Sequence, residues 1–132
     1  MFFQTEIVIP PNTAQDDPLV TRLQVQPGVT RQVWVMFPHG CFGLVHLQVW
    51  YWGWQLWPWT PGSSFAWDDY VMSFEDRYPL TEPPYELVLK AWNDDDTYEH
   101  RVTFACTIEP AAPQDELERL HDALLALGLL RG

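Results

Sequence analysis

The sequence predicts one antiparallel β-sandwich of about seven or eight short strands, followed by a C-terminal amphipathic helix. Polar and apolar residues alternate through most of the chain, as they do in strands with one buried and one exposed face. Turn residues separate these stretches at the spacing typical of sandwiches. The alternation argues against a parallel α/β sheet, whose strands would be continuous apolar runs. Both an Ig-like and a jelly-roll strand order fit this pattern.

Three strands are predicted in the N-terminal part of the chain, each bounded by turn residues. Pro10 and Pro11 end the first strand, because proline has no N–H to donate to a neighbouring strand. Pro27 and Gly28 form a turn between the second strand and the third. The three predicted strands cover residues 3–9, 19–25 and 30–37.

The longest predicted strand covers residues 44–52, where apolar residues alternate with His46, Gln48 and Trp50. Gly53 breaks this strand and a short return strand follows it. A loop rich in proline, glycine and serine comes next, and further on the acidic connection 93–97 has the composition of a hairpin turn. The later predicted strands cover residues 54–57, 65–74 in two pieces, 85–92 and 98–108.

The C-terminal part of the chain differs in kind from the sandwich. We predict a β-sandwich domain with an N-terminal arm over residues 1–109, a Pro-rich spacer over 110–113 and an amphipathic helix over 114–132. Leucines recur in this helix at three- and four-residue steps, which places them on one face. One helix cannot bury that face alone, so it packs either on its own sandwich or on a neighbouring subunit or partner. This leucine stripe consists of Leu117, Leu120, Leu124 and Leu127.

The charge of the chain excludes some classes of partner. Its 132 residues carry 18 acidic and 7 basic side chains, which gives a formal net charge of −11. A field of this sign repels phosphate backbones, so we expect no nucleic-acid partner and no binding to a membrane surface. The first residues lack the basic region and the long apolar core of a signal peptide, so we expect synthesis in the cytoplasm.

The sequence contains no recognisable catalytic or metal-binding motif. The four histidines are scattered, and Ser63 and Ser64 do not lie in a nucleophile elbow. The acids of residues 94–96 are typical of a solvated turn, although clustered oxygens also suit Ca²⁺. Cys106 alternates with the apolar residues that are predicted to face the core in strand 98–108, so we predict that it is a buried free thiol. A Cys41–Cys106 disulfide is the alternative. We therefore predict a protein that is not an enzyme, with no catalytic residues, cofactor or metal.

The strongest functional signal is a concentration of tryptophans. The chain has eight, far more than the core of a small domain needs. Most of the tryptophans that follow Val49 lie on the strand face that points away from the core, so we predict an exposed contact surface there. The alternative is that both sheet faces are covered, one of them by the helix or the N-terminal arm. The predicted contact residues are Trp50, Trp52, Trp54, Trp57, Trp59 and Trp67, with Trp34 and Trp92 as additions from other strands.

Two stretches of the chain carry a resemblance to a known group of proteins. The runs QLWPWTPGSSFAWDDYVMSFEDRYPL and PPYELVLKAWNDDDTYEHRVTF contain a Trp-Pro turn, a PPYEL strand entry and the acidic hairpin 93–97. From Leu19 to Phe104 the chain resembles small uncharacterised all-β proteins of phage and prophage structural modules. The resemblance implies a virion or particle component without a cofactor, and it transfers no functional residue.

Two functions suit an aromatic surface of this kind. The first is assembly, as a homo-oligomer or with other assembly subunits, because interface cores are rich in aromatic residues and poor in charge. The second is a carbohydrate-binding β-sandwich module, in which exposed tryptophans stack on sugar rings. Two separate apolar surfaces on one acidic domain favour assembly. We therefore predict a non-enzymatic structural or interaction protein, in line with the virion subunit that the resemblance implies.

Overall fold

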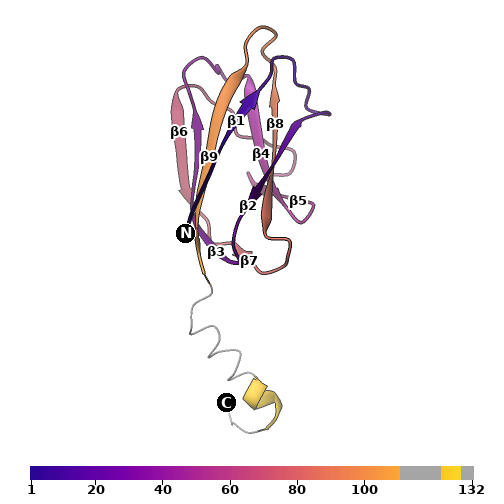
Figure 1. The fold of residues 1–132 in the computed structure, drawn as a ribbon, viewed down its shortest axis with the longest axis vertical. Coiled ribbons are helices and arrows are strands. Elements are labelled where there is room, and N and C mark those ends of the chain that lie inside the picture. Colours follow the sequence, from indigo (N-terminus) through magenta and orange to yellow (C-terminus); the bar gives the residue numbers. More distant parts are fainter. Residues whose placement is uncertain (111–122, 129–132) are drawn as a thin grey trace.

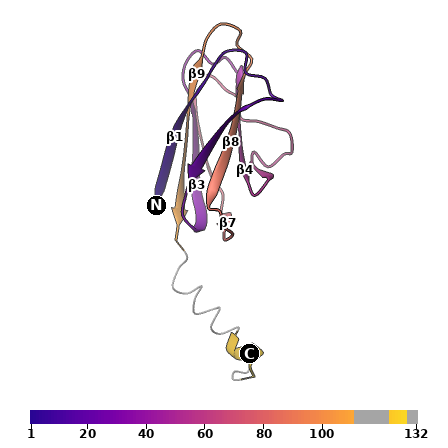
Figure 2. The same cartoon turned by 45° about the vertical axis from the view of Figure 1, so that its right-hand side comes forward.

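Two antiparallel sheets pack face to face in the computed structural model, which describes residues 1–110 and 123–128 (Figure 1). The predicted antiparallel β-sandwich is confirmed. Figure 2 shows β1, β3 and β9 on one side of the sandwich and β4 and β8 on the other. The first sheet has the order β1 (Phe2–Ile9), β9 (His100–Glu109), β3 (Gly28–Phe37), β6 (Tyr70–Glu75), and β7 (Pro79–Leu80) also pairs with β3. The second sheet has the order β2 (Leu19–Gln24), β8 (Glu86–Asn93), β4 (Val45–Tyr51), β5 (Trp54–Trp57).

The strand pairs nest inside one another along the sequence. β1 pairs with β9, β2 with β8, β3 with β6 and β4 with β5, and successive pairs alternate between the two sheets. The pairs β3–β9 and β4–β8 then complete the sheets. This is the strand order of a jelly roll, in which one long antiparallel hairpin wraps into two sheets. Of the two strand orders that the alternation allowed, the structure has the jelly roll.

The core lies between the sheets and is built from the inward phase of the alternating strands. In β3 the side chains of Val33, Val35 and Phe37 are buried, while Trp34 and Met36 between them lie outside the core. Burying an apolar side chain of this size stabilises the fold by about 1.5–3 kcal/mol. The largest fully buried side chains of the other strands include Ile9, Leu47, Leu87, Leu89, Phe104 and Ile108.

The N-terminal segment is a strand of the first sheet and not a free arm. Every residue from Phe2 to Ile9 is paired in register with β9. Ile7 and Ile9 point into the core, and Val8 between them points outwards, as do Phe2, Gln4 and Glu6. The expected N-terminal arm is therefore part of the sandwich, and it places Phe2 on the outer face of the first sheet.

One turn of the predicted C-terminal helix lies within the described residues. Residues 123–126 are helical, and the amide of Leu127 donates to the carbonyl of Ala123. Gly128 follows with a φ of 75°, a left-handed conformation that glycine adopts at no steric cost. Leu117 and Leu120 lie outside the described residues, whereas Leu124 and Leu127 lie within them. In the described part of the chain, no helix has the length and apolar character needed to cross a bilayer.

Candidate contact surfaces

The fold divides the predicted tryptophan surface, and Trp57 is not part of any surface. Its ring is fully buried, with the ring of Phe74 6.1 Å away between centroids. Its indole nitrogen donates to the carboxylate of Asp76 at 2.7 Å. The pairing of β4 with β5 shifts register after Val49, and the consecutive residues Leu56 and Trp57 are both buried. The prediction that Trp57 is a contact residue is therefore wrong, because Trp57 belongs to the core.

Trp52 and Trp54 lie at the tip of the β4–β5 hairpin. Tyr51 pairs with Trp54, which leaves Trp52 and Gly53 as a two-residue turn. Both turn residues have positive φ values, 54° and 77°, as in the type I′ turns whose twist suits a hairpin. The indole nitrogen of Trp52 donates to the carbonyl of Glu82 at 2.9 Å and so fixes the tip. About half of each of these two residues remains exposed to solvent.

Trp67 lies at the opposite end of the sandwich from this hairpin tip. Its carbonyl accepts a hydrogen bond from Gly43, which precedes the start of β4, whereas Trp52 follows the end of β4. Its ring packs on Tyr70 with 5.6 Å between centroids. Trp67 and the tryptophans of the hairpin tip therefore face different surroundings. Trp59 is exposed as well, and its indole nitrogen donates to the carboxylate of Asp76 that Trp57 also uses.

Trp50 lies on the outer face of the second sheet beside polar groups. The ammonium of Lys90 is 4.0 Å from the centroid of a Trp50 ring, a cation–π contact. The indole nitrogen of Trp50 donates to Gln48 at 3.1 Å. Trp50 and Trp54 line a groove of about 560 Å³, which we call the Trp50 groove. Its principal lining residues are Gln15, Gln48, Trp50, Trp54, Gln55 and Pro61.

Two glutamines fasten the loop that forms one wall of the Trp50 groove. Gln55 donates to the carbonyls of Pro58 and Ser63 at 2.7 and 2.9 Å. Gln48 donates to the same Ser63 carbonyl at 3.0 Å. These bonds hold the loop against β4 and β5 and shape the groove before any ligand arrives. Gln15, Trp54 and Pro61 are exposed members of the groove, so an amide and an indole are accessible there.

Ser64, His46 and Asp94 form a Ser–His–Asp cluster on the same outer face. These residues are far apart in the sequence, so the sequence alone did not indicate the cluster. In His46, Nδ1 lies 2.8 Å from Ser64 Oγ and Nε2 lies 3.0 Å from Asp94 Oδ2. Trp92 stacks on the imidazole with 5.0 Å between ring centroids, so Trp92 is buried and is not an exposed aromatic. His100, which β9 carries, belongs to the other sheet and does not approach His46 across neighbouring strands.

The backbone around Ser64 attaches its loop to β4 and to the loop's own start. A catalytic serine needs free N–H groups nearby to stabilise an oxyanion. The N–H groups on both sides of Ser64 are already bonded, that of Ser63 to Thr60 at 3.0 Å and that of Phe65 to Leu47 at 2.9 Å. We therefore interpret the cluster as a clamp that fixes the 58–65 loop and the 93–97 hairpin to β4.

The acidic hairpin uses its carboxylates to stabilise its own turn. Asp95 accepts hydrogen bonds from the amides of Thr97 and Tyr98 at 2.9 and 3.2 Å. It also lies 2.8 Å from the ring nitrogen of His100, and this bond is the main reason that the pKa of Asp95 is below its ordinary value. Within residues 1–110 and 123–128, no group of three or more His, Cys, Asp or Glu side chains is placed to hold a metal ion.

Cys41 and Cys106 are both free thiols, as predicted for Cys106, and the disulfide alternative is not formed. Both side chains are fully buried. Burial raises the pKa of Cys41 to about 11 and that of Cys106 to about 12. Because the thiolate is the reactive form of cysteine, neither side chain is suited to nucleophilic chemistry at neutral pH.

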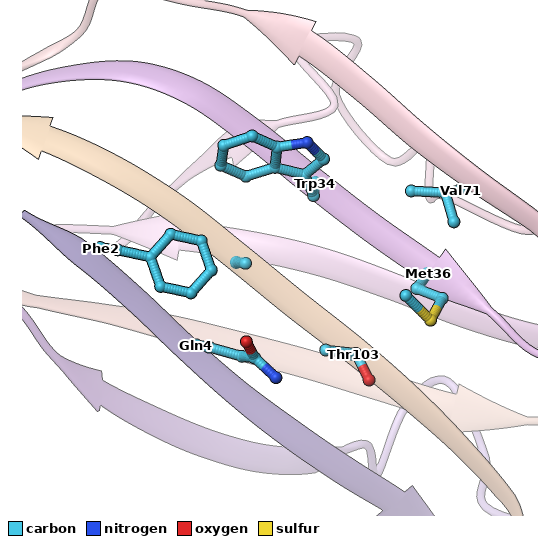
Figure 3. A pocket seen from close by; sticks show the side chains of 7 residues that line it. Phe2, Gln4, Trp34, Met36, Val71 and Thr103 are labelled. Carbon is cyan, nitrogen blue, oxygen red and sulfur yellow. The ribbon is translucent and has the colours of Figure 1, made fainter.

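The outer face of the first sheet carries an apolar groove that the sequence analysis did not identify. Figure 3 shows the rings of Phe2 and Trp34 on either side of β9, with Met36 and Val71 further along. The two rings are 5.9 Å apart between centroids. The groove has a volume of about 240 Å³, and we call it the β9 groove. Its lining residues are Phe2, Gln4, Trp34, Met36, Val71, Thr103 and Ala105.

Strand register explains why this groove exists. Ala105 of β9 is paired with Gln4 on one side and with Trp34 on the other. In the same way Thr103 is paired with Met36. Small side chains on the central strand therefore form a floor between larger side chains on its neighbours. Met36 is 45% exposed, so this wall of the groove is open to solvent.

Jelly rolls occur in viral capsid and lectin domains and in small-molecule-binding enzymes, so the strand order alone does not assign a function. No protein-family model matches this chain, and no match was found among curated proteins or among solved structures.

Proposed function

We propose that this protein is a non-enzymatic structural component that assembles with further copies of itself through the outer face of the first sheet. The β9 groove carries the proposal. Phe2, Met36 and Val71 are each about half exposed in a single chain, beside a floor of small side chains. Covering such apolar surface with another chain removes it from water, which favours association. Aromatic residues and methionine are also the side chains enriched in interfaces.

The charges around the groove support contact between like copies. A net charge of −11 makes two chains repel each other at a distance. At the groove, however, the lining residues are uncharged. The nearby residues Glu6 and Arg101 form an ion pair at 3.6 Å, and Arg31 pairs with Glu109. Local charges are thus balanced within each chain, in keeping with the virion or particle subunit that the resemblance implies.

The substitution Met36→Asp tests this proposal. We expect it to convert a defined oligomer into monomers, because a carboxylate in the wall of the groove loses its hydration when a second subunit covers it. Size-exclusion chromatography with light scattering measures the change in mass. Val20→Asp is the matched control, since Val20 is 48% exposed against 45% for Met36 but lies on β2 in the other sheet. A wild-type protein that is monomeric at its highest soluble concentration, or an unchanged mass for Met36→Asp, contradicts the proposal.

Carbohydrate binding is a second candidate function, and the Trp50 groove favours it. Sugar rings present flat C–H faces that stack on indoles, and their hydroxyl groups bond to amides. Trp54 is 48% exposed at the open side of this groove, and Gln15 adds an exposed amide. The glutamine bonds that hold the neighbouring loop preorganise the groove, which lowers the entropic cost of binding.

For this candidate we expect Trp54→Ala to abolish the retardation of the protein in gels that contain neutral polysaccharides. Removal of the stacking surface is expected to weaken binding at least tenfold, or by about 1.4 kcal/mol. Trp67→Ala is the control, because Trp67 is 53% exposed but lies at the other end of the sandwich. Equal migration of the wild type with and without a panel of plant, bacterial and algal polysaccharides contradicts carbohydrate binding and leaves assembly as the function.

A further inference from the structure

We propose that the β9 groove of one copy receives the leucine-rich C-terminal segment, residues 114–130, of a neighbouring copy. This inference rests on the proposed assembly and names the part of the partner that fills the groove. The groove is suited to a single row of apolar side chains, since it has a narrow floor between raised walls. Ala105 and Thr103, two residues apart along β9, have smaller side chains than the neighbours they pair with, so the floor lies lower than its walls.

The spacing of the leucines in the segment fits the length of the groove. The leucine stripe runs from Leu117 to Leu127, ten residue steps that span about 15 Å in a helix. The floor of the groove runs along β9 from Thr103 to Ala105, two residue steps that span about 7 Å in a strand. Successive leucines of the stripe are three or four residues apart, about 4.5–6 Å along a helix, so two of them fit along the floor together. Its side chains and those of the groove are apolar or neutral, which suits close packing.

The direction of the chain favours a neighbouring copy over the same chain. β9 ends at Glu109, and the segment follows after a spacer that begins and ends with Pro110 and Pro113. A residue before proline disfavours the helical backbone conformation, so the sequence of this spacer does not favour a tight reversal of the chain. To reach its own groove the segment would have to run back along β9, because Ala105 lies four residues before the end of that strand. In the single chain, Leu127 of the stripe is 73% exposed.

The first test of this inference removes the stripe without shortening the protein. We expect the double variant Leu120→Asp/Leu124→Asp to run as a monomer in size-exclusion chromatography, with an unchanged far-ultraviolet circular dichroism spectrum. The control, Ala112→Asp/Ala126→Asp, adds the same charge away from the stripe, because residue 126 falls on the opposite side of a helix with about 3.6 residues per turn. It should retain the mass of the wild type. Unfolding of the sandwich in the leucine variant would mean that the segment belongs to its own core, which overturns the inference.

The second test places the segment in the groove of the other copy. A Met36→Cys chain and a differently tagged Leu124→Cys chain are mixed and treated with diamide, which oxidises two thiols to a disulfide and is itself reduced. We expect a covalent dimer that contains both tags. Val20→Cys in place of Met36→Cys should give none, and the native Cys41 and Cys106 are fully buried. No mixed dimer, or a disulfide within one chain that carries both new cysteines, overturns the inference.

Comparison with Met36→Asp separates the two proposals. If Met36→Asp dissociates the oligomer and Leu120→Asp/Leu124→Asp does not, assembly through the β9 groove stands and the C-terminal segment is not its occupant. If neither variant dissociates the oligomer, or the wild type has no oligomer, both proposals fail.

Discussion

Replacing Trp57 with alanine is expected to lower the free energy of unfolding by about 3–5 kcal/mol, a large share of the stability of a domain of this size. Trp57 is fully buried, with the rings of Phe74 and Phe104 6.1 and 6.3 Å away. Its removal leaves a cavity that rigid strands of both sheets cannot close. It also removes the N–H group that bonds to Asp76 at 2.7 Å. Urea unfolding followed by far-ultraviolet circular dichroism measures the change.

Two further variants divide this effect into its causes. Trp57→Phe keeps much of the ring and loses the donor, so it should cost less than Trp57→Ala. Trp59→Ala removes an exposed ring that donates to the same Asp76 carboxylate, and it should cost less than about 1 kcal/mol. Equal losses for Trp57→Ala and Trp59→Ala would mean that the bonds to Asp76, and not the packing of Trp57, stabilise this part of the core.

Trp57 also marks the point where sequence reasoning about the fold breaks down. Period-two alternation identified the buried faces of β3, β4 and β9, because those strands keep one phase across most of their length. β5 is short, and the register of its pairing with β4 changes after Val49. Leu56 and Trp57 are both buried as a result, although they are consecutive. A bulge of this kind depends on the partner strand, so the pattern of one strand does not reveal it.

The sequence did not distinguish a jelly-roll from an Ig-like strand order, for a related reason. Alternation reports that a strand has a buried face, but not which strand lies beside it. The outermost pair, β1 with β9, joins the two ends of the sandwich, and no local signal specifies such a contact. The same limit hid the β9 groove. Trp34 and Met36 on the outward phase of β3 were visible signals, whereas their approach to Phe2 and Val71 required the order of β1, β9, β3 and β6.

The outer faces of the two sheets differ in chemistry, and this difference bears on the proposed function. On the first sheet, the β9 groove is apolar and suits a hydrophobic segment of another protein chain. On the second sheet, glutamines and Lys90 surround Trp50, a mixture that suits a hydrated ligand better than a dry interface. Since these grooves lie on opposite sides of the sandwich, assembly through one leaves the other accessible. Carbohydrate binding would then add to assembly and not compete with it.

Gly28→Ala is the second substitution for which we expect a large effect, about 3–5 kcal/mol of lost stability. Gly28 is buried at the start of β3 with a φ of 153°, a conformation that residues with a Cβ rarely adopt. A Cβ built there would lie 2.0 Å from the carbonyl oxygen of Glu109 and 3.0 Å from a methyl group of Ile108. Because the nearest atom belongs to the backbone, the end of β9 must move away from β3 to make room. Thermal and urea unfolding measure the loss.

Gly53→Ala separates the effect of the backbone conformation from that of the close contact. Gly53 also has a positive φ, 77°, but no atom lies within 4 Å of a Cβ built there. It should therefore cost only about 1–2 kcal/mol, the price of a left-handed conformation. Equal losses for the two variants would show that the contact with Glu109 contributes nothing. We expect a larger loss for Gly28→Ala than for Gly53→Ala. We also expect a weaker oligomer in Gly28→Ala, because displacement of the end of β9 would change where the C-terminal segment leaves the sheet.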